Sequence, residues 1–205
     1  MSQKLIIGVL VSGRGTNLHK ILDGAQSGEL NVKVAVVISN REKSEGFLRA
    51  RSRGVPAVFL DPKKYQSTQE YDVAILETLR KYEVQLVVLA GYMKIVSFVL
   101  IAAYRNRMMN IHPSLLPSFP GLHAQRQALE YGVKKAGCTV HFVEEDVDAG
   151  PIILQSTVSV EYADTEQTLS ARILEQEHII LPRALQLYSE GLIKVVGRCV
   201  EIGQI

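Results

Sequence analysis

The first hundred residues alternate between two hydrophobic patterns, and this alternation limits the possible folds more than any other feature. Short, nearly all-apolar runs rich in β-branched residues occupy 5–12, 32–39, 56–60 and 84–91. Such runs are typical of strands buried on both faces of a parallel sheet. Segments 17–28 and 67–82 instead carry apolar residues at helical spacing. The alternation predicts βαβ crossovers and an open, mostly parallel, twisted α/β sheet with helices on both faces.

The second half of the chain has a different pattern. An apolar run at 107–112 is followed by a loop rich in Pro, Gly and Ser and by a short predicted helix at 123–132. Segments 137–145 and 151–162 alternate more strongly and predict antiparallel neighbours across the turn DVDAG. We expect a helix from about 164 to 190, interrupted near Pro182, and a terminal strand over 192–202. With no repeat or linker, 1–205 is predicted to be a single domain with halves at 1–100 and 101–205.

Charge and cysteine content exclude several classes of function. The formal net charge of +2 over 205 residues argues against nucleic-acid binding through a broad basic surface. Cys138 and Cys199 are far apart and have no second ligand at CxxC spacing, so neither a disulfide framework nor a metal site is expected. The N-terminal apolar run is too short for a signal peptide or a membrane span. We therefore expect a cytoplasmic protein that does not bind membranes.

The segment SGRGTNL, residues 12–18, is a glycine-rich turn between a predicted strand and a predicted helix. Gly13 and Gly15 permit unusual backbone angles, and the first amides of the helix could hold a phosphate. A tight turn with Thr16 as the helix cap explains the segment equally well. The Walker A sequence is absent, and Leu18 stands where a dinucleotide fingerprint has its third glycine. A phosphate monoester is therefore the predicted anion, if one binds.

The segment NIHP places Asn110 and His112 two residues apart at the end of a buried strand. Their side chains then share one face near the carboxyl end of the strand, where open α/β sheets bind ligands. The Asn N–H can stabilise an oxyanion, and the His can transfer a proton near neutral pH. The alternative is a buried pair satisfied by backbone groups. Ser114 shares this face only if the strand continues past Pro113, so covalent catalysis is not favoured.

Prolines then end the strand. Pro113, Pro117 and Pro120 follow His112 closely and lack the N–H groups that a sheet needs. The chain must therefore leave the sheet just after His112, and Leu116–Pro117 is the peptide bond that we expect to be cis.

Three carboxylates are candidates for the same site. Asp146 and Asp148 flank the turn before Gly150, and either could orient an imidazole and raise its pKa, or simply cap the turn. The residues alone do not choose between them. Glu177 falls on the apolar stripe of the last predicted helix, where it either reaches a ligand or extends to water from the edge of the stripe.

Four segments together resemble the phosphoribosylglycinamide formyltransferases, a family of folate-dependent formyltransferases. These are SGRGTNL, LAGYMKIVS, NIHPSLLPSFPGLHA and GCTVHFVEEDVDAGPIILQ, in that order and covering nearly the whole chain. The resemblance implies transfer of the formyl group of 10-formyltetrahydrofolate to the amine of glycinamide ribonucleotide in purine biosynthesis, without a metal or a covalent intermediate. It also implies a mononucleotide-binding first half, a folate-binding and catalytic second half, and small-molecule substrates for a monomer or homodimer.

The resemblance assigns roles to individual residues. It places the catalytic residues at Asn110, His112 and Asp148, and so selects Asp148 over Asp146. It places nucleotide binding at Gly15, Thr16, Asn17 and Glu177, and folate binding at Met93, Lys94, Ile95, Val96, Asn110 and the loop 141–148. A folate-binding Arg of the family is replaced by Thr68, for which Lys63 or Lys64 could substitute.

Other activities in the same superfamily remain as alternatives. These are 10-formyltetrahydrofolate hydrolase, which usually has an N-terminal regulatory domain, and nucleotide-sugar amine formyltransferase. A tRNA-specific relative has an extra C-terminal barrel, whereas this chain stops at Ile205 and its predicted sheet begins near Lys4. A non-enzymatic nucleotide-binding module predicts instead that Asn110, His112 and Asp148 do not converge.

Overall fold

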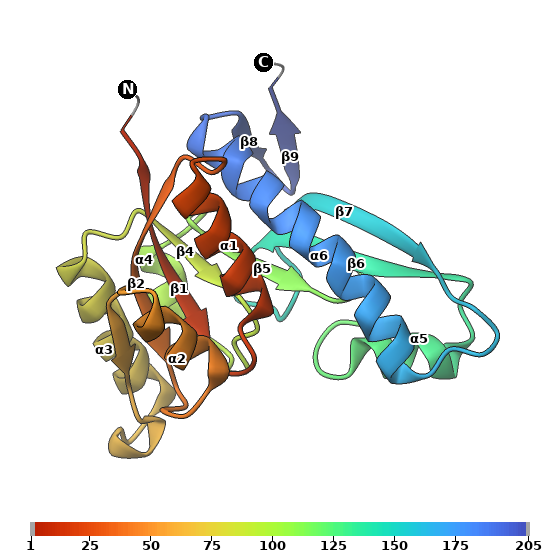
Figure 1. Ribbon diagram of the computed structural model, residues 1–205, viewed down its shortest axis with the longest axis horizontal. Helices are drawn as coiled ribbons and strands as arrows, with labels where there is room; N and C mark the ends of the chain where they lie inside the picture. The colour runs from red at the N-terminus through yellow and green to blue at the C-terminus, as the bar shows by residue number, and fades with distance from the viewer. Residues whose placement is uncertain (1–2, 204–205) are drawn as a thin grey trace. The chain divides into compact units, whose positions relative to one another are not determined.

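The computed structural model describes residues 3–203 as an α/β fold (Figure 1). Seven strands form a mostly parallel sheet in the order β3-β2-β1-β4-β5-β6-β7, and a separate sheet pairs β8 with β9. This is the fold class that the alternating sequence pattern predicts. The chain divides into two compact units, Met1–Met109 and Asn110–Ile205.

The first unit is built on parallel strands. They are β1 (Leu5–Val11), β2 (Val32–Ser39), β3 (Ala57–Phe59) and β4 (Leu86–Leu89). Strand β1 pairs in parallel with β2 on one side and with β4 on the other. Every residue of β4 is buried, as expected for a strand that is covered on both faces. The all-apolar runs are explained by this double burial.

Helices and one 3-10 turn connect these strands: α1 (Thr16–Ser27), α2 (Glu45–Ser52), η1 (Pro62–Lys64), α3 (Thr68–Lys81) and α4 (Phe98–Ala103). Helices α2 and α4 were not predicted from the sequence. The Ser44 hydroxyl caps α2 by accepting from the Phe47 N–H, and the buried Asp72 carboxylate accepts from the Ser97 N–H at the start of α4. The cap of α2 is visible in the sequence, but the contact of Asp72 with Ser97 depends on the tertiary structure.

The direction of the crossovers changes at β1, because β2 follows β1 on one side of it and β4 lies on the other. Ligands of open α/β sheets bind at the carboxyl ends of strands beside such a point. Two predicted binding segments, 12–17 and 93–96, follow β1 and β4 respectively. The Ser12 N–H donates to the Gly91 carbonyl at 3.1 Å, which joins the first segment to the residues just before the second.

The second unit begins inside β5 (Met108–His112) and continues with α5 (Ala124–Tyr131), β6 (Lys135–Phe142), β7 (Ile152–Ser159) and α6 (Glu166–Ser189). Strands β6 and β7 pair antiparallel, which confirms the prediction across the turn DVDAG. Helix α6 packs along both strands (Figure 1). Its buried face includes Leu169, Ile173 and Leu181, which are 0% exposed.

Two predictions for the end of the chain were wrong. Helix α6 is continuous from Glu166 to Ser189 with Pro182 inside it. Burial of Leu181 and Leu185 on either side of Pro182 stabilises the helical path despite the missing N–H. The expected single terminal strand is a hairpin of β8 (Ile193–Val196) and β9 (Cys199–Ile202). Gly197, at φ 60°, permits the tight turn between them.

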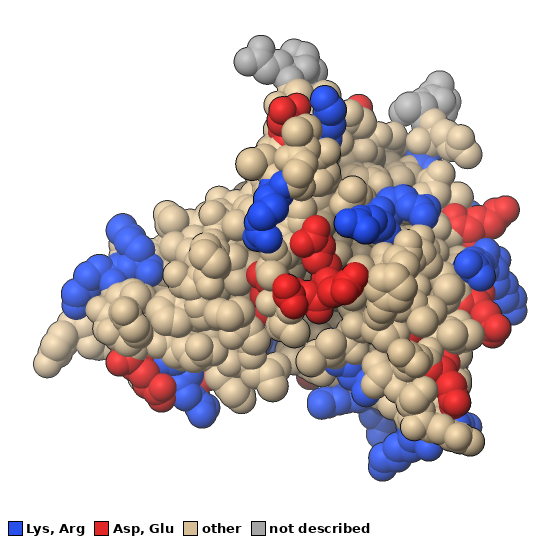
Figure 2. Space-filling view, turned by 180° about the vertical axis from the view of Figure 1, so that it is seen from behind, with Lys and Arg blue, Asp and Glu red and all other residues tan. Residues whose placement is uncertain are grey.

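Acidic and basic side chains are interspersed over the face shown in Figure 2. Within residues 3–203, no helix combines the length and the apolar character needed to cross a membrane.

Candidate active site

The glycine loop, defined as residues 12–17, leads into the N-terminus of helix α1, which has no side-chain cap. Gly15 occupies the N-cap position of α1 at φ 67° and ψ 35°, and no side chain caps the helix. Thr16 is the first helical residue, so the alternative interpretation of Thr16 as a cap was wrong. Gly15 has no side chain with which to cap α1, and a helix N-terminus that follows a glycine in this way is a place where proteins bind anions.

Helix α2 holds the glycine loop in shape. The Gly46 N–H donates to the Gly13 carbonyl at 3.0 Å. A Cβ atom at position 15 would lie 2.4 Å from the Gly46 Cα, so no side chain fits there. Because Gly15 also has a positive φ, both the backbone angle and the close approach require glycine. The sequence indicated the first requirement only, because α2 was not predicted.

A basic cleft borders the same loop. It has a volume of about 350 Å³ and is lined by Ser12, Gly13, Arg14, Arg41, Lys43, Ser44 and Glu45. Arg14, Arg41 and Lys43 are exposed and carry three positive charges against one carboxylate. Their field favours an anionic ligand at this end of the first unit.

The predicted folate segment follows β4 and is anchored to the glycine loop. The Met93 N–H donates to the Ser12 hydroxyl at 2.8 Å. Met93 and Ile95 are 59% and 69% exposed, whereas Val96 is 8% exposed. The Lys94 ammonium lies 5.6 Å from the centre of the Tyr71 ring. The segment thus presents two apolar side chains to solvent from a backbone that is fixed in place.

Thr68 is the exposed first residue of α3, and both Lys63 and Lys64 on η1 are exposed. The proposed replacement of the family Arg by one of these lysines stays a prediction.

In the second unit, Asn110, His112 and Asp148 converge into one cluster, which we call the Asn-His-Asp cluster. His112 Nδ1 lies 3.2 Å from Asp148 Oδ2. Asn110 Nδ2 donates to Asp148 Oδ1 at 3.3 Å. The two strand residues therefore contact different oxygens of one carboxylate. This convergence is what the enzyme hypothesis requires and what the non-enzymatic alternative excludes.

Both ring nitrogens of His112 face acceptors. Nε2 lies 2.9 Å from the Phe119 carbonyl oxygen, which can only accept, and Nδ1 faces Asp148. Burial nevertheless lowers the pKa of His112, and outweighs the opposite effects of the Phe119 carbonyl and of Asp148. The expectation that a carboxylate raises the pKa of His112 is correct for the interaction with Asp148. It is wrong for the net shift, which is downward because burial has the larger effect. Burial thus favours the neutral imidazole, whereas the Phe119 carbonyl and Asp148 favour the cation.

Asp148 is held by several donors. Burial alone raises its pKa, but hydrogen bonds from His141 and from the Gly121 N–H, together with the charge of His112, lower it overall. The Gly121 N–H lies 2.8 Å from Oδ2. Asp148 adopts φ 54°, a left-handed conformation that Asp tolerates better than most residues. Asp146, by contrast, is exposed, so the structure favours the same carboxylate as the family resemblance.

Sequence reasoning missed His141, which belongs to this cluster. Its side chain is 2% exposed, and its Nε2 lies 3.1 Å from Asn110 Nδ2 and 3.5 Å from Asp148 Oδ1. The available signal was its position on a strand just before the acidic turn.

The proline loop, residues 113–121, contacts His112 through the Phe119 carbonyl. Strand β5 ends at His112 as predicted, and the Leu116–Pro117 peptide bond is cis as predicted. The Ser114 hydroxyl donates to the Ser118 carbonyl at 2.6 Å and is buried, so it is not presented as a nucleophile. The Thr139 hydroxyl on β6 donates to the Ser114 carbonyl at 2.7 Å and ties the loop to the sheet.

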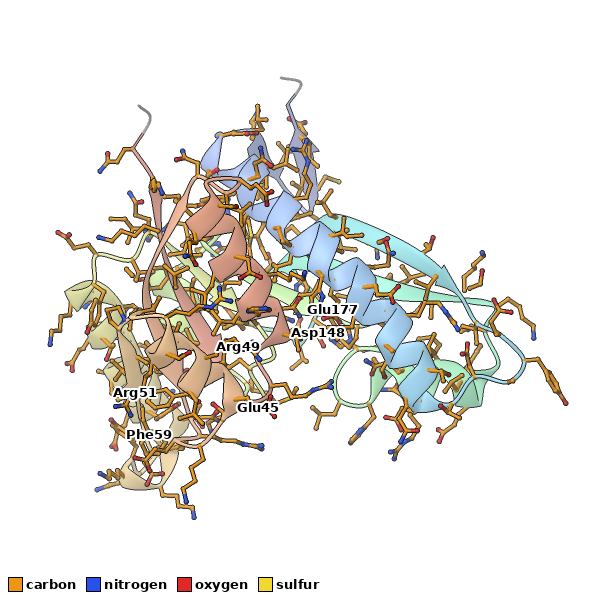
Figure 3. All side chains as sticks on the ribbon, viewed as in Figure 1. Glu45, Arg49, Arg51, Phe59, Asp148 and Glu177 are labelled. Atoms are coloured by element: carbon orange, nitrogen blue, oxygen red, sulfur yellow. The ribbon has the colours of Figure 1, made fainter. Side chains whose placement is uncertain are left out.

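Glu177 is 8% exposed on α6, so the alternative in which it extends to water was wrong (Figure 3). Burial, assisted by the charge of Glu177, raises the pKa of Cys138 to about 12. Cys138 is therefore an inert thiol. Among residues 3–203, no group of three or more His, Cys, Asp or Glu side chains is arranged to hold a metal ion.

Comparison with known proteins identifies the family. Residues 5–185 match the family described as formyl transferase. The chain belongs to the formyl transferase family. Among curated formyl transferase relatives, it is 40% identical over 189 residues to phosphoribosylglycinamide formyltransferase of Escherichia coli, covering 92% of this chain and 89% of that protein. It is 44% identical over 193 residues to the human trifunctional purine biosynthetic protein adenosine-3, covering 94% of this chain but only 19% of that protein.

Solved structures of formyl transferase relatives have the same fold as this chain. Glycinamide ribonucleotide transformylase 1 from Symbiobacterium toebii has a TM-score of 0.98 at 53% identity, covering 100% of this chain and 96% of that chain. A formyltetrahydrofolate deformylase from Pseudomonas syringae has a TM-score of 0.91 at 30% identity, covering 99% of this chain and 67% of that chain. The formyl transferase fold is thus shared by relatives named for transfer and for deformylation.

Proposed function

We propose that this protein transfers the formyl group of 10-formyltetrahydrofolate to the amine of glycinamide ribonucleotide, the reaction for which its phosphoribosylglycinamide formyltransferase relatives are named. The observation that carries the proposal is the Asn-His-Asp cluster, in which Asn110 and His112 both contact the Asp148 carboxylate. Such a cluster supplies a hydrogen-bond donor for an oxyanion, a proton carrier and a group that orients it. The Ser114 hydroxyl is buried and donates to the Ser118 carbonyl, which argues against a covalent route through it.

The chemistry requires one addition and one elimination. The substrate amine attacks the formyl carbon, and the carbonyl electrons move to oxygen to give a tetrahedral intermediate. Asn110 and protonated His112 stabilise this oxyanion, while Asp148 holds the imidazole. The intermediate then breaks its bond to the folate nitrogen, which takes a proton derived from the amine through His112. The products are the formylated ribonucleotide and tetrahydrofolate.

The first unit supplies the proposed binding groups for the phosphate and for folate. The amides of Gly15, Thr16 and Asn17 bind the phosphate at the start of α1, where the N-cap residue is a glycine with no capping side chain. Met93, Lys94, Ile95 and Val96 bind the pterin, with Met93 and Ile95 exposed on an anchored backbone. The exposed Thr68 cannot supply the charge of the family Arg, so we propose that Lys63 or Lys64 contacts the folate glutamate.

In the second unit, the acidic turn before Asp148 contributes to the folate site and Glu177 contributes to nucleotide binding. Glu177 lies buried on α6, the helix that packs along β6 and β7, and the family resemblance supports a nucleotide-binding role for it. We further propose that the protein acts in the cytoplasm as a monomer or homodimer. Size-exclusion chromatography with light scattering tests the second point.

The decisive experiment offers purified protein 10-formyltetrahydrofolate with one of three acceptors: glycinamide ribonucleotide, a nucleotide-sugar amine or water alone. We expect tetrahydrofolate release that depends on glycinamide ribonucleotide, with one formylated product per folate. Release at the same rate in water alone would contradict the proposal and establish a hydrolase. Transfer only to the sugar amine would contradict it as well.

The hydrolase is the second candidate, because the deformylase from Pseudomonas syringae shares the fold at 30% identity. An uncapped glycine loop beside a basic cleft favours the transferase, since water as acceptor needs no phosphate site. Omitting the ribonucleotide in the assay separates the two directly.

A further inference from the structure

The β6–β7 turn, residues 143–150, carries Asp148 and is fixed at its base. The Phe142 N–H donates to the Pro151 carbonyl at 2.9 Å, which joins the last residue of β6 to the residue before β7. Gly150 lies so close to the Phe142 carbonyl that a Cβ at position 150 would collide with it. Residues 145–147, at the tip, are exposed. Asp148 lies between the fixed base and the exposed tip, so its position depends on the residues next to it.

Ala149, the residue directly after Asp148, has both of its backbone polar groups engaged. Its N–H donates to the Asp146 carbonyl at 3.3 Å. Its carbonyl accepts from Nη2 of Arg198 at 2.9 Å, across 49 residues of the chain. Asp148 itself adopts φ 54°, and a left-handed residue with a Cβ persists only where its surroundings hold it. The bond from Arg198 is part of those surroundings.

The β8–β9 hairpin brings Arg198 to this position. Gly197 and Arg198 form the two-residue turn between its strands. At the base of the hairpin, the Gly203 N–H donates to the Leu192 carbonyl at 2.8 Å, and the Leu192 N–H donates to the Leu187 carbonyl of α6 at 3.0 Å. Strand β9 lies beside β7 (Figure 1). Because the hairpin is anchored in this way, it presents Arg198 from a defined position.

The charge of Arg198 suits the turn that it contacts. Glu144, Glu145 and Asp146 precede Asp148 directly or within four residues, and like charges repel one another. A guanidinium stays charged at all physiological pH values. Arg198 contacts a backbone oxygen of the turn, which leaves both oxygens of the Asp148 carboxylate for the Asn-His-Asp cluster. The cation therefore offsets the repulsion without competing for the carboxylate.

We propose that Arg198 is a positioning residue that holds Asp148 against His112 through the Ala149 carbonyl, which makes the β8–β9 hairpin part of the support of the active site. The inference rests on the proposed function and extends it to a segment that the proposed mechanism does not use. Asp148 orients the imidazole from a place where its Oδ2 lies 3.2 Å from His112 Nδ1. A misplacement of about 1 Å can lower a rate by roughly 10²-fold, so a partial loss of support is measurable.

Three variants test this role. Arg198→Ala removes the bond to Ala149, Arg198→Lys keeps a charged donor, and Lys194→Ala removes a positive charge from the same hairpin. Lys194 is the matched control, because it pairs with Glu201 at 3.8 Å and both side chains are exposed. We expect kcat to fall about five- to tenfold in Arg198→Ala and less than about twofold in the other two variants.

The KM for glycinamide ribonucleotide should change by less than about twofold in all three variants, because its proposed phosphate site lies in the first unit. Arg198 is exposed, so thermal melts of the variants should stay close to that of the wild type. A purely structural role would lower the melting temperature and leave kcat unchanged.

Nitrogen-15 NMR of the histidine rings gives a readout that is independent of activity. The titratable groups beside His112 are Asp148, which raises its pKa, and His141, which lowers it. Displacement of Asp148 in Arg198→Ala therefore lowers the pKa of His112. Loss of the positive charge alone would have the opposite sign, because a cation disfavours the imidazolium. We expect a lower pKa of His112 in Arg198→Ala and an unchanged one in Lys194→Ala.

The outcomes separate this inference from the proposed function. A wild-type protein without formyl transfer overturns both. An active wild-type protein with equal kcat in Arg198→Ala and Lys194→Ala overturns the role of Arg198 alone. Equal losses in Arg198→Ala and Arg198→Lys would also overturn it, as would a pKa of His112 that rises or stays the same in Arg198→Ala.

Discussion

The glycine loop and the Asn-His-Asp cluster show two ways of building a site. In the loop, the proposed binding groups are backbone amides, and the shape is fixed by the approach of Gly46 to Gly15. In the cluster, the groups are side chains, and the shape is fixed by a single carboxylate, Asp148, with contacts to both of its oxygens. The loop therefore depends on backbone conformation and the cluster on charge. Substitutions should divide along the same line, with effects on KM at the loop and on kcat at the cluster.

The largest effect is expected for His112→Ala. Loss of a proton-transferring group costs roughly 10²–10⁴ in rate. We expect a fall of that order in kcat, with the KM for the ribonucleotide changed by less than threefold, measured by steady-state assay. Unchanged turnover would remove His112 from the mechanism. An equal loss through KM would erase the distinction between the two sites.

Asp148→Asn keeps the size of the side chain and removes its charge. A hydrogen bond to a charged group contributes about 1.5–3 kcal/mol, so we expect kcat to fall about 10- to 10²-fold. The Asp146→Asn variant is the matched control, because Asp146 is exposed on the same turn. If both variants lose activity equally, the effect comes from the charge of the turn and not from contact with His112.

Gly15→Ala tests the loop. A left-handed conformation costs about 1–2 kcal/mol for a residue with a Cβ, and the collision with Gly46 adds to this. We expect lower stability in urea unfolding and a KM for the ribonucleotide raised about tenfold or more, as for the loss of one charged hydrogen bond.

Gly28→Ala is the control for this variant. Gly28 has φ 85° at the other end of α1, with nothing within 4 Å of an added Cβ. It should lose stability through the backbone angle only and keep its KM. Equal loss of stability in the two variants would show that the contact with Gly46 has no energetic effect.

The smallest effect is the pH dependence of stability. Burial lowers the pKa of His112 in the folded protein. Between that lowered pKa and a pH of about 6.5, the unfolded chain therefore binds a proton that the folded chain does not. The contribution to the free energy of unfolding is complete above about pH 6.5 and is lost as the pH falls, by at most about 1.4 kcal/mol per pH unit. Urea unfolding from pH 8 to pH 5 measures it.

The His112→Gln variant should lose this slope. Asp148 acts in a lower window, because its pKa is lowered: its contribution is present above about pH 4 and is lost as the pH falls through its folded value. A slope above pH 5 that survives in His112→Gln would assign the titration to another group.

The sequence by itself determined the parallel sheet, the end of β5 at His112 and the residue types at both sites. All-apolar β-branched runs leave no solvent-facing side, and three prolines cannot continue a ladder, so these features follow from local chemistry. The family resemblance added the choice of Asp148.

Tertiary structure decided the rest. The continuity of α6 through Pro182 depends on packing of its neighbours in the core, and the start of α4 is held by the Asp72 carboxylate of α3, which accepts from the Ser97 N–H. The burial that lowers the pKa of His112 and the contact of His141 with Asn110 involve residues far apart in the chain. No local pattern encodes these pairings, because an imidazole has the same sequence signature whether its partner is water, a carbonyl or a carboxylate.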